Sequence, residues 1–122
     1  MSMHSPLNAK FGIQTEDLPD GTVALSLATD ASFANEIGVI HGGITMLLLD
    51  GAMGRAAGRT LTAGQGCATI QFSAQFLAPG QGRLRAVGRV VKRGRNVAFL
   101  EGECTREDGT LIARAQGSWA IR

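Results

Sequence analysis

The pattern of apolar and polar residues predicts one long helix, over residues 41–59. Ile44, Leu47 and Leu48 mark one face of this helix. Apolar residues also fill the other faces: Met46, Leu49, Ala52 and Met53. A helix that is apolar on nearly all sides has to be covered on nearly all sides. Asp50 lies in the middle of it, and burying a carboxylate is costly unless another group compensates it. Asp50 is therefore the first candidate functional residue.

Alternation of apolar and polar residues predicts one strand before this helix. Residues 22–29 carry Val23, Leu25 and Leu27 on one side, which is typical of a half-buried strand. Residues 10–16 are short and mixed, and they predict either a first strand or an irregular arm. Residues 30–40 are rich in Ser, Asn and Gly and form a loop that leads to the helix.

Four more strands follow the helix, over residues 67–78, 83–91, 97–106 and 111–121. In the first of them, strict period two places Ala68, Ile70, Phe72, Ala74 and Phe76 on the face opposite Thr69, Gln71, Ser73 and Gln75. Short turns separate the strands, and short turns require antiparallel neighbours. The sequence thus predicts an α+β domain, in which an antiparallel sheet of five or six strands wraps around one long central helix.

Composition limits the class of protein further. A chain of 122 residues with 44% apolar and 18% charged residues predicts a single globular domain over residues 1–122. The sequence has neither the layout of a signal peptide nor a run long enough to span a membrane, so we expect a cytoplasmic protein without membrane contact. Cys67 and Cys104 lack metal-ligand spacing and predict free thiols, and we expect no metal site.

The positive charge of the chain is concentrated in one segment. Residues 83–95 contain six cations and no acid: Arg83, Arg85, Arg89, Lys92, Arg93 and Arg95. Such a segment either attracts an anion or forms a solvated strand face. Nucleic acid is not the expected partner, because the chain has no tyrosine and its five Phe and one Trp fall mostly on inward strand positions. A stacking platform among the arginines is therefore missing.

One constellation resembles a known family. Asn35 is followed by His41-Gly42-Gly43, and Asp50 lies nine residues after the histidine. This pattern is similar to the signature of the hotdog-fold acyl-CoA thioesterases of the phenylacetate-degradation (PaaI-like) type. The Phe-x-x-Pro-Gly segment at 76–80, the basic glycine turn at 93–95 and the Ala-x-Gly-x-Trp segment at 115–119 agree with it.

The resemblance implies a fold, an assembly and a reaction. The fold is a sheet wrapped about a central helix, and the unit is a homodimer with active sites at the interface, often paired into a homotetramer. The reaction is hydrolysis of an acyl- or aryl-CoA to the free acid and coenzyme A, which is part of the substrate; no other cofactor is expected. Thr69 lies where related enzymes carry a hydroxyl that positions water. His41 holds the loop and polarises the carbonyl, or only caps the helix.

The residues themselves support a site at the start of the helix. Gly42 and Gly43 leave backbone N–H groups free at the positive end of the helix dipole, where a thioester carbonyl would find an oxyanion hole. Alternatively, the two glycines only allow close packing of helix and sheet. His41 and Asn35 add polar groups at the same place.

Asp50 lies eight residues beyond Gly42. That spacing is about 12 Å along a helix, too far for both to act on one carbonyl. Either the two features are unrelated, or Asp50 acts with the helix start of another copy of the chain. Antiparallel helices across a two-fold axis would bring the Asp50 of one chain to the Gly42 of another, and this geometry requires a dimer. We expect Asp50 to act as a general base or as a nucleophile. The alternative is a structural carboxylate that caps a loop or is paired to Arg55 or Arg59.

Arg93, Gly94, Arg95 and Asn96 are the candidates for binding the phosphates of coenzyme A. A solvated turn is the other interpretation. Two further functions remain: a hotdog protein that binds acyl-CoA without cleaving it, and a dehydratase on the same fold. The first has little need of a buried carboxylate. The second usually needs an acid–base histidine paired with a carboxylate in another arrangement.

Overall fold

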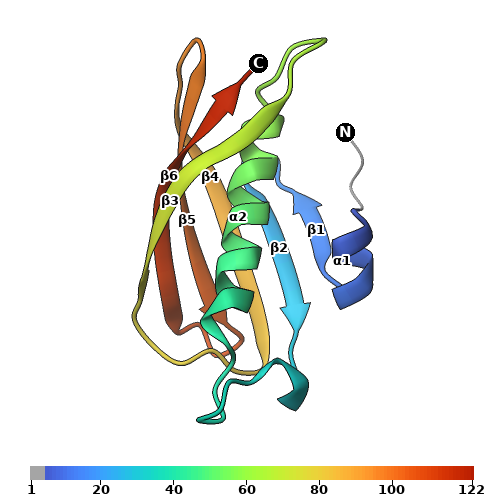
Figure 1. Ribbon diagram of the computed structural model, residues 1–122, viewed down its shortest axis with the longest axis vertical. Coiled ribbons are helices and arrows are strands. Elements are labelled where there is room, and N and C mark those ends of the chain that lie inside the picture. The colour runs from blue at the N-terminus through green and yellow to red at the C-terminus, as the bar shows by residue number, and fades with distance from the viewer. Residues whose placement is uncertain (1–4) are drawn as a thin grey trace.

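The computed structural model describes residues 5–122 and shows a six-stranded antiparallel sheet curled around a central helix (Figure 1). This confirms the predicted α+β architecture. No helix in this part of the chain is long and apolar enough to cross a membrane. The elements are α1 (Pro6–Phe11), β1 (Gln14–Asp17), β2 (Val23–Ala28), the 3₁₀ turn η1 (Ala31–Phe33), α2 (Gly42–Gly58), β3 (Cys67–Phe76), β4 (Arg83–Arg93), β5 (Val97–Arg106) and β6 (Leu111–Ile121).

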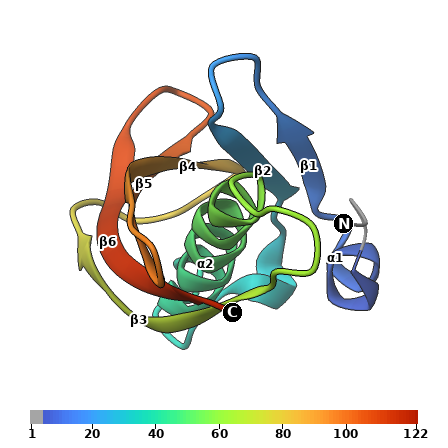
Figure 2. The ribbon, with the colours of Figure 1, turned by 90° about the horizontal axis from the view of Figure 1, so that it is seen from above.

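The order of strands in the sheet is β1-β2-β4-β5-β6-β3. Strands β4, β5 and β6 are joined by short turns and lie side by side, as their turns require. Strand β3 precedes them in the chain, yet it pairs with β6 at the far edge. The chain reaches that edge by passing through α2, which lies in the hollow of the sheet (Figure 2). Strands β1 and β3 are therefore the two edges.

Helix α2 buries one stripe of its surface. The buried positions recur every three or four residues: Thr45, Leu48, Leu49, Ala52, Met53, Ala56 and Ala57. They share a core with Leu27, Leu84, Leu100 and Trp119, each at most 1% exposed. Met46, Leu47 and Asp50 are only half-buried. The prediction of a helix covered on nearly all sides is thus wrong for a single chain, because one strip of α2 stays open.

The stripe lies directly against the backbone of β4. A Cβ atom placed on Gly88 would be 2.4 Å from the carbonyl oxygen of Ala52 and 2.6 Å from the amide nitrogen of Met53. Only a residue without a side chain allows helix and strand to approach this closely. Gly88 therefore fixes the depth at which α2 sits in the sheet.

Strand β3 breaks the strict alternation that its sequence predicts. Its pairing with β6 shifts between Thr69 and Gln71, which is a β-bulge that turns the strand by one residue. Ile70 is consequently 55% exposed, although period two places it on the inner face. Thr69, predicted to face away from the core, points instead at α2, where its hydroxyl bonds a helix side chain. A one-residue shift moves side chains to the other face of a sheet.

The N-terminal segment contains the predicted first strand, but the strand starts only at Gln14 and a short helix precedes it. Residues 10–16 contain the end of α1 and the start of β1. The side chain of Ser5 caps α1 by accepting from the amide of Asn8 at 3.0 Å, and Gly12 ends it with φ +74°. Phe11 then packs against Phe33 with ring centroids 5.9 Å apart. A helix of six residues is too short to show a clear period.

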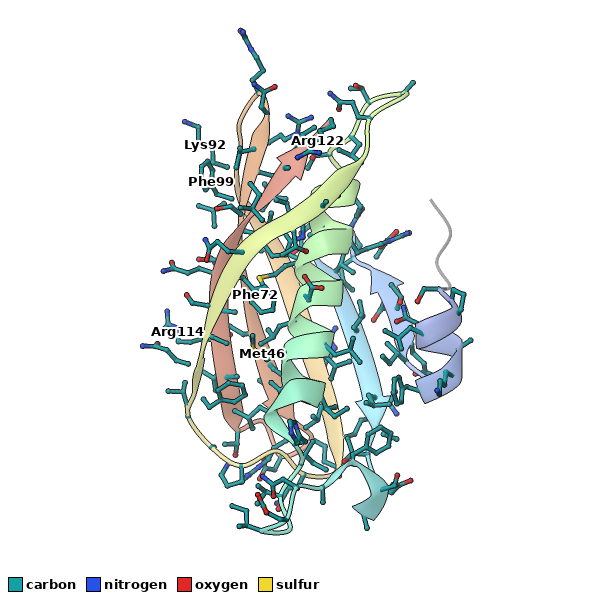
Figure 3. The ribbon with its side chains drawn as sticks, viewed as in Figure 1. Met46, Phe72, Lys92, Phe99, Arg114 and Arg122 are labelled. Carbon is teal, nitrogen blue, oxygen red and sulfur yellow. The ribbon has the colours of Figure 1, made fainter. Side chains whose placement is uncertain are left out.

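The basic segment lies on the outer face of the sheet and is partly paired there. Arg83 donates to Gln14 at 2.7 Å, Arg85 lies 3.8 Å from Glu16, and Arg89 forms an ion pair with Glu101. Lys92, Phe99 and Arg114 also point away from α2 (Figure 3). Strand β4 continues to Arg93, so the turn is shorter than the predicted 92–96. The solvated-face interpretation therefore describes Arg83, Arg85 and Arg89.

We predict that Gly88→Ala lowers the free energy of unfolding by about 1–3 kcal/mol, because its methyl group would overlap the backbone of α2. Chemical denaturation at a fixed protein concentration measures this change. Gly66→Ala is the matched control, since its Cβ would meet no atom within 4 Å. Equal stability of the two variants would contradict the close contact.

Candidate active site

The start of α2 presents a free backbone donor. The Nδ1 atom of His41 accepts from the amide of Gly43 at 2.8 Å, so His41 is the N-cap of the helix. The amide of Gly42 donates to no acceptor within residues 5–122. It lies at the positive end of the helix dipole. A carbonyl or carboxylate oxygen is the kind of group that this amide can bind.

Asn35 organises the loop that leads to His41. Its Oδ1 atom accepts from the amides of Ile37 at 3.1 Å and Val39 at 3.3 Å. The amide of His41 in turn donates to the carbonyl of Phe33 at 2.9 Å. Asn35 therefore acts on the α2 start through the loop backbone, and the sequence spacing alone could not show this.

Asp50 is held by a residue from β3. The hydroxyl of Thr69 donates to Oδ1 of Asp50 at 2.8 Å, while Oδ2 has no hydrogen-bond partner in the part of the chain that is described. Asp50 is half-buried and belongs to the open strip of α2. The bulge after Thr69 is what turns this hydroxyl toward the helix. The structure thus brings together the predicted pair Asp50 and Thr69.

The two helix arginines point elsewhere than Asp50. Arg55 donates to both carboxylate oxygens of Asp17, at 3.1 and 2.9 Å, and this hydrogen-bonded guanidinium lowers the pKa of Asp17. Arg59 donates to the carbonyls of Leu18 and Thr22. Both side chains fasten α2 to β1 and to the turn that follows it. The structure therefore does not pair Asp50 with either of these arginines.

Gly42 and Asp50 occupy one strip of α2 but stay apart. Gly42, Met46, Asp50 and Gly54 follow one another at intervals of four residues, which places them on the same side. This side faces β3: the ring of Phe76 lies 3.4 Å from a Cβ built on Gly42, and Cys67 Sγ lies 3.8 Å from the Gly54 carbonyl oxygen. The rise of a helix separates Gly42 from Asp50 by about 12 Å. One chain therefore holds two separated halves of a site.

The predicted phosphate-binding turn joins β4 to β5 and lies at the other end of the molecule from the start of α2 (Figure 1). The guanidinium of Arg93 donates to Thr60 at 3.1 Å, to Gln65 at 3.0 Å and to the carbonyls of Gly94 and Arg95. It thereby joins the β4–β5 turn to the loop after α2. Arg95 and Asn96 are exposed. These two side chains can bind a ligand without breaking a hydrogen bond within residues 5–122.

A pocket adjoins the start of α2, where the helix meets the loop over residues 30–40. Its volume is about 510 Å³. Half-buried apolar residues line it: Phe11, Phe33, Ala34 and Ile44. Exposed residues form its rim: Ser32, His41 and Gly43. A hollow of about 590 Å³ on the outer face of the sheet contains neither Asp50 nor the helix start.

The two thiols are free, as predicted. Burial raises the pKa of Cys67, and it raises the pKa of Cys104 to about 12. A thiol with a raised pKa stays protonated at neutral pH and is a poor nucleophile. The carboxylate of Asp50 is therefore the better candidate for chemistry.

An antiparallel sheet curled around one long helix, with a double glycine at the helix start, is the architecture of the hotdog fold. The sequence agrees with this class, because residues 37–113 match the family model of the thioesterase superfamily. The chain belongs to the thioesterase superfamily.

Individual relatives support this assignment. A protein of Saccharolobus solfataricus named as a candidate esterase is 32% identical over 110 residues, which cover 89% of this chain and 78% of that protein. The crystal structure of a Bacillus halodurans protein with CoA is 30% identical in sequence and has a TM-score of 0.91. The match covers 100% of this chain and 82% of the Bacillus halodurans chain. A Ralstonia eutropha protein, named as a candidate thioesterase related to phenylacetic acid degradation, is 28% identical and has a TM-score of 0.87. The match covers 96% of this chain and 91% of the Ralstonia eutropha chain.

We predict that His41→Ala destabilises the fold by about 0.5–2 kcal/mol, because the amide of Gly43 loses its cap. His41→Asn should retain most of the stability, since asparagine caps the same position. Thermal unfolding of the three proteins measures the difference. An alanine variant as stable as the asparagine variant would show that the cap contributes nothing.

Proposed function

We propose that this chain is an acyl-CoA thioesterase, which hydrolyses an acyl- or aryl-CoA to the free acid and coenzyme A. The observation that carries the proposal is the pair of half-sites on α2: the free amide of Gly42 and the carboxylate of Asp50 held by Thr69. Membership of the thioesterase superfamily and the CoA present in the Bacillus halodurans structure support it.

The chemistry assigns a part to each group. The thioester carbonyl accepts a hydrogen bond from the Gly42 amide, which stabilises the negative charge that develops on its oxygen. Thr69 occupies Oδ1 of Asp50 and so leaves Oδ2 for the reaction. As a general base, Asp50 takes a proton from water while the water oxygen attacks the carbonyl carbon. The C–S bond then breaks, the proton held by Asp50 passes to the departing sulfur, and the free acid and the thiol of coenzyme A are released.

Asp50 can instead act as the nucleophile. Its oxygen then bonds the carbonyl carbon, the thiolate of coenzyme A leaves, and the resulting mixed anhydride is hydrolysed by water. Both routes use the same residues and the same oxyanion donor. The proposed site contains Asp50, Gly42 and Thr69, with His41 and Asn35 positioning the start of the helix.

A complete site requires a second copy of the chain. Two α2 helices packed antiparallel through their open strips would place each Asp50 beside the other chain's Gly42. The exposed edge of β3 and the half-buried Met46 and Leu47 lie on the side that such a dimer would cover. We therefore propose a homodimer with two sites at its interface; two dimers pair into a tetramer in the enzymes that the sequence resembles.

The same geometry accounts for the position of the phosphate-binding turn. In an antiparallel pair, the β4–β5 turn of one chain lies at the end where the other chain's α2 begins. Arg95, with Gly94 and Asn96, would then bind the phosphates of a coenzyme A whose thioester is at the partner's helix start. Arg93 would hold this turn in place through its bonds to Thr60 and Gln65.

Replacing Asp50 tests the reaction. We expect Asp50→Ala and Asp50→Asn to lower the rate of thiol release from acyl-CoA at least about 100-fold, because the group that activates water or attacks the carbonyl is lost. Asp50→Asn keeps an oxygen for Thr69 and so preserves the local packing. A protein that binds acyl-CoA without turnover, or variants as fast as wild type, would refute the proposed chemistry.

Mixing two inactive variants tests the shared site. Gly42→Pro removes the N–H donor and should leave the helix intact, since proline is accepted at the first helical position and His41 has a compatible ψ of 132°. Mixed with Asp50→Ala and allowed to exchange, it should restore about a quarter of the wild-type activity, because about half of the dimers are mixed and each has one intact site of two. No recovery after confirmed exchange would refute a site shared between two chains.

Arg95→Ala should raise KM for acyl-CoA severalfold and leave kcat nearly unchanged, because it removes a contact made equally in the ground and transition states. Steady-state kinetics measures both constants. Arg89→Ala is the control, since its side chain pairs with Glu101 on the outer face. An unchanged KM in Arg95→Ala would show that this turn is not part of the binding site.

A further inference from the structure

The pocket beside the start of α2 has the features of a site for an apolar group. Its apolar lining consists of Phe11, Phe33, Ala34 and Ile44, and among residues 5–122 no Asp, Glu, Lys or Arg lines it. The rings of Phe11 and Phe33 pack at 52° and form one wall. A volume of about 510 Å³ is ample for such a group, since about 150 Å³ is enough for benzene.

The rim of this pocket belongs to the catalytic end of the helix. His41 and Gly43 flank Gly42 in the chain, and both line the pocket. A carbonyl bound to the Gly42 amide would therefore have the pocket next to it, and the chain attached to the carbonyl carbon could enter. The other side of Gly42 is occupied by the ring of Phe76.

We propose that this pocket receives the acyl group of the substrate, and that the wall formed by Phe11, Phe33 and Ala34 sets the size accepted. The preferred substrates are thioesters of uncharged, apolar acids. A carboxylate or ammonium group on the acyl chain would lose its hydration without gaining a partner there. This inference rests on the proposed function and adds the class of acyl group to it.

Two substitutions change the pocket in opposite directions. Ala34→Leu fills it, and residue 34 has an extended backbone (φ −79°, ψ 150°) that accepts leucine. Phe33→Ala enlarges it. Phe99→Ala is the matched control, because Phe99 is a 44%-exposed phenylalanine on the outer face of the sheet. Met46→Ala tests the rival location between α2 and β3, where the side chain of Met46 lies (Figure 3).

The experiment measures kcat/KM for acetyl-, butyryl-, hexanoyl-, benzoyl- and succinyl-CoA. In wild type, butyryl-CoA should exceed succinyl-CoA, which has the same chain length but carries a charge, by roughly a hundredfold. Ala34→Leu should lower the hexanoyl and benzoyl values relative to acetyl by roughly tenfold or more. Phe33→Ala should shift the preference toward hexanoyl-CoA, and Phe99→Ala should leave every ratio unchanged.

The outcomes separate this inference from the proposed function. If wild type hydrolyses thioesters but Ala34→Leu lowers all five values equally, or if only Met46→Ala changes the ratios, the acyl group lies elsewhere and the inference fails alone. If wild type cleaves none of them, the proposed function fails. Amide NMR shifts of Ala34 and Ile44 with uncleaved hexanoyl-CoA then decide the pocket: movement supports it, and unchanged signals overturn it.

Discussion

Helix α2 lies directly on the backbone of β4, and this contact determines where the other parts of the molecule can lie. Gly88 leaves no side chain between the strand and the carbonyl of Ala52. The sheet can therefore curl around the helix, and β3 can reach the far edge to pair with β6. The same depth leaves the strip with Gly42, Met46 and Asp50 only half-buried beside the edge strand β3. The open strip is a consequence of how the helix is seated.

The carboxylate on that strip depends on an irregularity in β3. With a regular strand, Thr69 would face away from the core and Asp50 would lose its donor. The bulge turns Thr69 toward α2 and then returns Phe72 to the core, where it stacks on Trp119 with ring centroids 6.1 Å apart. On β6, a Cβ on Gly117 would lie 2.3 Å from Cβ of Phe72. Packing against Phe72 therefore explains the Gly and Trp of the Ala-x-Gly-x-Trp segment, independently of any role in the site.

The apolar pocket arises where two short elements, α1 and η1, meet the start of α2. Phe11 comes from α1, Phe33 from η1, and Ile44 from the first turn of α2. The loop that brings η1 to the helix is held by Asn35 and by the bond from His41 to Phe33. The polar residues of the sequence signature therefore shape an apolar space, in addition to any contact that they make with a ligand.

The sequence by itself determined the long helix, the four strands that follow it and the antiparallel pairing, because side-chain period and turn length are local properties. It also singled out Asp50, Gly42 and His41, since a charge within an apolar helix and a glycine pair at its start are visible without coordinates. It could not place Ile70 and Thr69, because a bulge depends on pairing with β6. It also missed α1 and the contact of Phe11 with Phe33, since these two residues lie 22 positions apart in the chain. Only tertiary packing decides such contacts, because they join segments whose local patterns carry no record of one another.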